Sequence, residues 1–199
     1  MSDSDGEGDT KVAMMEATYR ALCQHGYSDT SISKIAAEFE KSKSLLYYHY
    51  DDKEELLEDF LHYMLDQLEA DLDSIEAETA HEELLSIVDR LLPEDIDGEQ
   101  MRFRRAVLEL RAQAPYHDAY REQFARSDEL ILSTLVDVIE RGIENGEFRS
   151  VNSREKAEFV YSLAYGAMER GVPLEDPETL NLTRETVVSH LEAQLVKFA

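Results

Sequence analysis

The side chains best suited to binding another molecule lie in residues 41–50, KSKSLLYYHY, a window without Asp or Glu. It contains two Lys, two Ser, three Tyr and one His, in a chain with 44 Asp and Glu against 20 Lys and Arg. Lys can meet a phosphate or a guanine edge, Ser can donate to phosphates, and Tyr can contact sugars and thymine methyl groups. The window therefore predicts a binding surface for a polyanion.

Two short helices joined by a tight turn are expected to position these side chains. Thr30 is a good N-cap for a helix over 31–38, and Ser42 can cap a second helix over 43–48. Two helices joined in this way form a helix-turn-helix, whose second helix enters the major groove of DNA. The spacing therefore predicts that the acid-free window faces DNA.

The segment 14–57 resembles the N-terminal domain of the TetR family of transcriptional regulators. The matching residues are His25-Gly26-Tyr27, Thr30-Ser31-Ile32, Ile35-Ala36, Ser42-Lys43, Leu46-Tyr47-Tyr48-His49-Tyr50 and Lys53-Glu54-Glu55-Leu56-Leu57. The turn Phe39-Glu40-Lys41 departs from the family, which usually has a small residue, Gly and an apolar residue there. Ser44 stands where Gly is common. These departures leave open which base sequence is read.

The resemblance implies a role for each candidate contact. Those expected to touch backbone phosphates are Thr30, Ser31, Tyr48, His49 and Lys53. Those expected to face the groove are Lys43, Ser44, Leu45 and Tyr47. Ser42 adds a short hydroxyl donor at a helix N-terminus, where the macrodipole also favours anions.

The remaining apolar periodicity and the scarcity of Pro and Gly predict an all-α fold of about nine helices. The expected parts are a disordered tail over 1–10, a helix-turn-helix domain over 11–52, and a helical effector-binding and dimerisation domain over 53–199. The helices expected outside the helix-turn-helix span 11–25 (ended by Gly26), 53 to about 80, 82–92, 99–112, 116–145, 154–170 and about 182–197.

The family resemblance implies a homodimer, in which the last two helices pack as a four-helix bundle and two reading helices meet a palindromic operator. Apolar residues at helical spacing supply candidate contacts independently of the resemblance. These dimer candidates are Phe159, Leu163, Ala167, Val187, Leu191 and Leu195.

Two rows of aromatic residues have two interpretations, ordinary core packing or the lining of an effector pocket for planar or cationic compounds. The sequence does not decide between them, and it identifies no effector. The candidate pocket residues are Met101, Phe103, Val107, Tyr116, Tyr120, Phe124, Tyr161, Tyr165 and Met168.

Several classes of protein are disfavoured. No apolar stretch reaches the roughly 18 residues of a membrane span, the N-terminus is acidic and polar, and Cys23 is the single cysteine. A cytoplasmic protein with no membrane partner is therefore expected. The pairs Asp59-x-x-His62 and Glu78-x-x-His81 fall on one predicted helix, too far apart to share a metal, so neither a metal nor a cofactor is expected.

The net charge of −24 indicates either an acidic surface that maintains solubility or adaptation to molar salt. Acidic residues are spread along most of the expected helices, and Lys is scarce, with seven Lys against thirteen Arg. Both observations favour a halophilic source. At about 1 M salt the Debye length is near 3 Å, so repulsion between this surface and DNA would be largely screened.

The function predicted is a TetR-like regulator, a repressor released from a palindromic operator by a small-molecule effector. The alternative is a helical small-molecule-binding protein or enzyme that does not bind DNA. Because no catalytic constellation was found, no enzymatic activity is predicted.

Overall fold

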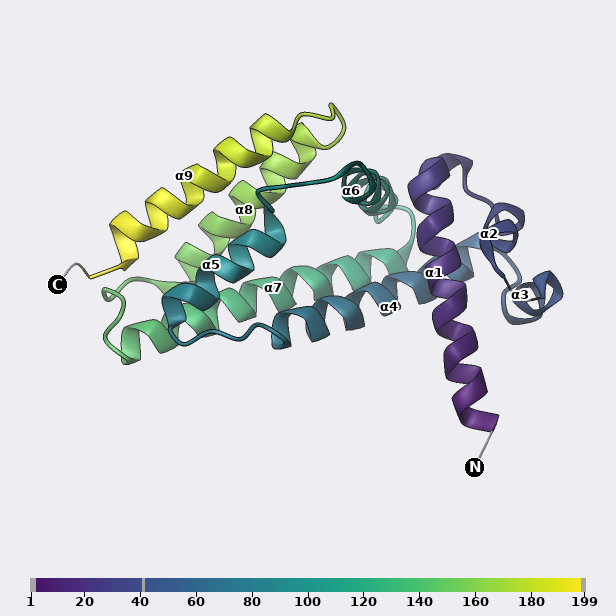
Figure 1. Cartoon of the computed structure of the whole chain (residues 1–199), viewed down its shortest axis with the longest axis horizontal. Coiled ribbons are helices and arrows are strands. Elements are labelled where there is room, and N and C mark those ends of the chain that lie inside the picture. The colour runs from purple at the N-terminus through teal and green to yellow at the C-terminus, as the bar shows by residue number, and fades with distance from the viewer. Residues whose placement is uncertain (1–2, 41, 198–199) are drawn as a thin grey trace. The chain divides into compact units, whose positions relative to one another are not determined.

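A computed structural model describes residues 3–40 and 42–197, and in these ranges the chain forms nine α-helices (Figure 1). The β-structure in these ranges is one isolated antiparallel bridge between Phe148 and Val196. The predicted all-α fold is confirmed. The helices are α1 (Asp3–Asp29), α2 (Ile32–Glu38), α3 (Lys43–His49), α4 (Lys53–Asp73), α5 (Ala80–Leu91), α6 (Gly98–Arg111), α7 (Asp118–Glu144), α8 (Ser153–Gly171) and α9 (Pro177–Leu195).

The first helix is longer than the sequence predicts at its beginning. It starts at Asp3, so the expected disorder over 1–10 is wrong for residues 3–10, while residues 1 and 2 lie outside the described ranges. Once the packed part of a helix has formed, each further residue adds to it at little cost in free energy, which accounts for the extra turns at the start of α1. The predicted break at Gly26 is confirmed, because φ there is 70°, a conformation that favours glycine.

Helix α4 is shorter than predicted, since it ends at Asp73 and not near residue 80. The Ser74 hydroxyl donates to the Asp71 carbonyl (2.8 Å) just beyond this end. Thr79 then caps α5, its hydroxyl accepting from the Glu82 amide at 3.1 Å. The prediction was wrong because continuous helical periodicity concealed this second N-cap.

Helix α9 begins five residues before its predicted start. Asp176 caps it, accepting from the Thr179 amide at 3.2 Å, and Pro177 occupies the first turn. Pro177, predicted to lie in a linker, suits this position because the first amides of a helix need no intrahelical acceptor.

The described chain divides into two compact units. The first joins the chain up to Gln67 to Gly98–Phe124, and the second joins Leu68–Asp97 to the chain from Ala125 onward. This division does not follow the predicted boundary after residue 52. Helix α6 and the start of α7 belong with the helix-turn-helix because α6 packs against α1 and they share one core.

The second unit is built around α8 and α9, which run alongside each other, with α5 also against α9 (Figure 1). Four of the six dimer candidates, Ala167, Val187, Leu191 and Leu195, are buried inside this single chain. Their assignment to a dimer surface is therefore wrong: the apolar stripe of α9 packs within its own protomer. Phe159 and Leu163 remain half-buried, with the Phe159 ring 4.3 Å from the His190 ring.

Candidate nucleic-acid interface

Helices α2 and α3 are fixed to the first unit by their apolar sides. Ile35, Phe39 and Leu46 are each at most 3% exposed and belong to the shared core. Ser31 is the N-cap of α2, accepting from the Lys34 amide at 3.4 Å, and Ser42 is the N-cap residue of α3. The outward direction of the remaining α3 side chains follows from this packing.

The face of α3 turned away from the core carries most of the predicted contacts. Ser42, Lys43, Ser44 and His49 are exposed, Tyr47 is 50% exposed and Tyr48 is 83% exposed. The hydroxyls of Ser42 and Ser44 lie 2.6 Å apart, so Ser42 does not make the predicted capping hydrogen bond. Both hydroxyls stand at the N-terminus of α3, and α3 itself contains no acidic residue. The structure thus brings six of the predicted contacts onto one surface.

Thr30 does not join that surface. Its side chain is 3% exposed and its hydroxyl donates to the Gly26 carbonyl at 2.6 Å and to the Ala21 carbonyl at 3.3 Å. It is also not the N-cap of α2, which is Ser31. A short hydroxyl before a helix can serve the preceding turn as well as the helix, so sequence alone did not separate these roles.

Lys53 and Leu45 are also more enclosed than predicted. The Lys53 ammonium donates to the Tyr27 carbonyl at 3.3 Å and lies 4.2 Å from the centre of the Tyr27 ring. Leu45 is half-buried and packs against the core. Ser31 keeps partial exposure, with its hydroxyl 2.9 Å from that of Ser33. Lys53, half-buried at the start of α4, thus already has partners within the protein.

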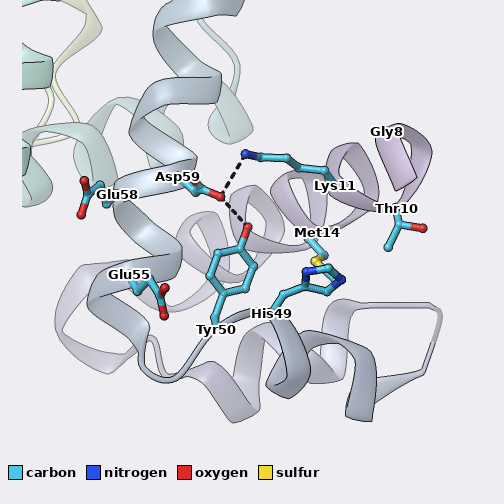
Figure 2. A pocket seen from close by; sticks show the side chains of 9 residues that line it. All are labelled: Gly8, Thr10, Lys11, Met14, His49, Tyr50, Glu55, Glu58 and Asp59. Atoms are coloured by element: carbon cyan, nitrogen blue, oxygen red, sulfur yellow. Dashed lines mark hydrogen bonds and ion pairs between the residues drawn. The ribbon is translucent and has the colours of Figure 1, made fainter. Parts of the chain in front are cut away.

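The structure also shows a polar cluster that sequence reasoning missed, beside the end of α3. Asp59 on α4 accepts from the Tyr50 hydroxyl at 2.8 Å and pairs with Lys11 of α1 at 3.0 Å (Figure 2). Partial burial raises the pKa of Asp59, but the hydrogen bonds from Lys11 and Tyr50 and the charge of Lys11 outweigh it and leave the pKa below its usual value. Burial and the bond to Asp59 raise the pKa of Tyr50.

This cluster borders a pocket of about 600 Å³ (Figure 2). The pocket residues are Gly8, Thr10, Lys11, Met14, His49, Tyr50, Glu55, Glu58 and Asp59. No sequence signal identified it, because its walls come from three helices that only the fold brings together. At this pocket Tyr50, which follows α3 directly, is linked to α4 through its hydrogen bond to Asp59.

The candidate effector residues of the first unit are mainly core. Met101, Tyr120 and Phe124 are at most 9% exposed, and the Phe103 ring packs 4.8 Å from the Tyr19 ring. Val107 is half-buried against the same core. Tyr116 is 80% exposed and precedes α7, so it does not continue the row of Tyr120 and Phe124. The buried members of this set therefore lie in the core, whereas Tyr116 lies on the surface.

The other three pocket candidates belong to the second unit. Tyr161 donates to Asp128 at 2.6 Å and Tyr165 to Glu169 at 2.5 Å, while Met168 is half-buried. The two phenols therefore already have carboxylate partners. Within the described ranges, no group of three His, Cys, Asp or Glu side chains is arranged to hold a metal ion. None of the helices in these ranges combines the length and hydropathy that crossing a bilayer requires.

Comparisons with known proteins cover both parts of the chain. A model for bacterial regulatory proteins of the tetR family matches residues 14–60, and a model for the C-terminal region of BetI-type transcriptional repressors matches residues 80–196. No protein with a curated description matches the sequence.

Solved structures extend the similarity to nearly the whole chain. A TetR transcription regulator from Haloarcula marismortui is 35% identical, with a TM-score of 0.86 over 94% of this chain and 99% of that one. A TetR-family regulator from Rhodococcus sp. is 26% identical, with a TM-score of 0.74 over 94% and 98%. A protein from Saccharomonospora viridis, described as a transcriptional regulator and solved in complex with choline, shares the fold at 20% identity, with a TM-score of 0.80 over 96% and 100%.

Proposed function

The chain belongs to the TetR family of transcriptional regulators, and we propose that it is a cytoplasmic repressor that binds a palindromic operator as a homodimer and leaves it when a small molecule binds. The outward face of α3 is the observation that supports this proposal. It presents a cation, hydroxyls and two tyrosine rings, and it contains no acidic residue. In a protein of net charge −24, such a face is where DNA phosphates meet least repulsion.

We assign the contacts by the geometry of α3 in a major groove. Lys43, Ser44 and Tyr47 would face base edges from the exposed side of the helix. Tyr48 and His49, at its end, would meet backbone phosphates. Further phosphate contacts would come from Ser31 at the start of α2 and from Ser42, whose hydroxyl stands at the start of α3. Thr30 is left out of this surface because its side chain is buried.

Dimerisation would use the sides of α8 and α9 that their mutual packing leaves open. Phe159 and Leu163 are half-buried on α8, Gly166 leaves open space around its Cα, and Leu182 on α9 is 63% exposed. Exposed apolar side chains beside a small residue suit close helix packing against a second copy. A homodimer formed in this way would contain two α3 helices, one for each half of a palindrome.

The effector we propose is a small planar or cationic organic molecule bound by the second unit. Tyr161 and Tyr165 supply aromatic surface there, and Asp128 and Glu169 supply negative charge. The S. viridis protein in complex with choline shares this fold, which supports an organic cation as the class to test first. Ligand and operator would then compete through their preferences for different conformations.

A DNA-binding assay across salt concentrations tests the proposal. A labelled duplex from the region upstream of the coding sequence is titrated with the protein between low salt and about 2 M KCl, followed by anisotropy and gel shift. We expect sequence-specific binding that persists at high salt, and release on adding the effector. A folded dimer that fails to bind this duplex at every salt concentration would contradict the proposal.

A double variant identifies the surface. Replacing Lys43 and Tyr47 together with Ala removes two groove contacts, each worth about 1–3 kcal/mol, so binding should weaken by about 30-fold or more. Both side chains are exposed, so the melting temperature and the dimer should persist. If the fold is lost instead, Lys43 and Tyr47 are core residues and do not form the binding surface, and the alternative of a helical small-molecule-binding protein or enzyme without DNA activity gains support.

A further inference from the structure

The kink at Gly26, where the last turn of α1 leads toward α2, is a backbone junction held by two side chains from other helices. Gly26 has φ 70°, and the Tyr27 amide that follows donates to Glu109 Oε2 of α6 at 2.6 Å. The Tyr27 carbonyl accepts from Lys53 Nζ of α4 at 3.3 Å. One peptide segment is thus bound on its N–H side by α6 and on its C=O side by α4.

The Glu109 contact has the properties of a strong hydrogen bond. It joins an amide to a carboxylate, it is short, and it is partly withdrawn from water. The site is also shaped around it, because a Cβ on Gly26 would lie 2.9 Å from Glu109 Oε2. Gly26 is therefore required for its positive φ and for the space that the carboxylate occupies.

The same junction leads directly to the reading helices. The Gly26 carbonyl accepts from both the amide (3.2 Å) and the buried hydroxyl (2.6 Å) of Thr30. Thr30 precedes Ser31, the N-cap of α2. Hydrogen bonds therefore connect the junction held by Glu109 to the residue that begins the helix-turn-helix.

We propose that Glu109 is a positioning residue for DNA recognition, which with Lys53 fixes the Gly26–Tyr27 junction and thereby the direction in which α2 and α3 leave α1. This inference rests on the proposed function, since its consequence is read in DNA affinity. Helix α4 continues into the second unit at Leu68, and residues 92–97 of the second unit lead directly into α6 at Gly98. A shift of either helix would therefore act on this junction.

The first test compares three variants with the upstream duplex. Glu109→Ala removes the acceptor and should weaken binding about tenfold, the usual effect of losing a hydrogen bond to a charged group. Glu109→Gln keeps an acceptor oxygen and should bind within about threefold of wild type. Glu122→Ala, an exposed α7 carboxylate with the same change of charge, should bind like wild type.

The second test does not use DNA. In the full-length protein, the Tyr27 amide proton resonance should lie downfield, and it should move upfield in Glu109→Ala, less in Glu109→Gln, and not in Glu122→Ala. If this resonance does not move in either Glu109 variant, the contact is absent and the inference is overturned. If Glu109→Ala folds poorly, Glu109→Gln serves the same purpose, and an unmoved resonance there again overturns it.

The two measurements separate this inference from the proposed function. Failure of the wild-type protein to bind the duplex contradicts the function, whereas the Tyr27 resonance still reports on the contact. If the resonance moves but both Glu109 variants bind DNA as tightly as wild type, the positioning role is overturned. A shifted resonance together with weaker binding, partly rescued by Gln, supports it.

Discussion

The tyrosines of α3 and those of α7 and α8 share one chemistry but have opposite surroundings. Tyr48 is 83% exposed on a helix whose other side is anchored in the core. Tyr120 is 2% exposed, with its hydroxyl 3.4 Å from the Glu54 carbonyl, and Tyr161 donates to Asp128. Tyr120 shows that a tyrosine in an aromatic row at helical spacing can serve core packing, whereas tyrosines left exposed by a well-packed short helix are available to a partner.

The two compact units show a second contrast. The first has a core drawn from distant parts of the chain, since Leu22, Phe60, Leu110 and Tyr120 all belong to it. Its helix-turn-helix is therefore supported by α4, α6 and the start of α7. The second unit is built on the pairing of α8 and α9, on which Phe159 and Leu163 stay half-buried and Leu182 is exposed. The first unit carries the surface that we propose for DNA, and the second carries the face that we propose for the dimer.

The largest expected effect is the difference in unfolding free energy between a variant of a buried tyrosine and a variant of an exposed one. Tyr120→Ala should lower the free energy of unfolding by about 3–5 kcal/mol, because it leaves a cavity in the core of the first unit. Tyr48→Ala should change that free energy by less than about 0.5 kcal/mol while weakening DNA binding. Denaturant unfolding at fixed salt measures both. Equal destabilisation by the two variants would show that the outward face of α3 is not exposed.

The next largest effect on stability is expected at Gly142, which lies against the Phe148 ring in the second unit. A Cβ on Gly142 would lie 2.2 Å from the Phe148 ring, so Gly142→Ala should destabilise the protein by about 1–3 kcal/mol. Thermal unfolding monitored by circular dichroism measures the change. In a Phe148→Leu background the ring is absent, so the same substitution should cost less. An equal cost in both backgrounds would mean that the ring is not the obstacle.

The smallest effect concerns the cluster beside α3. Because the pKa of Asp59 is lowered in the folded state, its contribution to stability is present above its unfolded pKa near 4 and is lost as the pH falls through the lowered folded value. Asp59→Asn should therefore flatten the dependence of unfolding free energy on pH in this acidic range. At neutral pH the loss should stay below about 1 kcal/mol, since the side chain is 37% exposed.

A matched variant on the same helix controls for charge. Asp66 is exposed on α4, so Asp66→Asn makes the same change of charge without removing the contacts that Asp59 makes with Lys11 and Tyr50. Urea-induced unfolding at several pH values below 5 distinguishes the Asp59→Asn and Asp66→Asn variants. Identical curves for both variants would show that the bonds from Lys11 and Tyr50 do not lower the pKa of Asp59.

Much of the fold could be predicted from local signals, and the errors fall at particular residues. Gly26 ends the regular part of α1, and α3 begins at Lys43, as predicted. The end of α4 was missed because Thr79 begins a new helix inside a continuous apolar period, and the start of α9 was missed because Pro177 opens a helix. Turn and cap chemistry competes with periodicity at these points, and periodicity alone does not show which one prevails.

The sequence by itself determined the helical class, the family and the composition of the α3 surface, because those depend on residue type and on spacings of a few positions. The tertiary structure alone decided that Thr30 and Lys53 turn inward, that Leu191 and Leu195 pack inside the protomer, and that Glu109 holds the Tyr27 amide. Each of these depends on a contact between segments far apart in the chain or on which side of a helix is buried. Burial and long-range hydrogen bonding are set by packing, which no local pattern specifies.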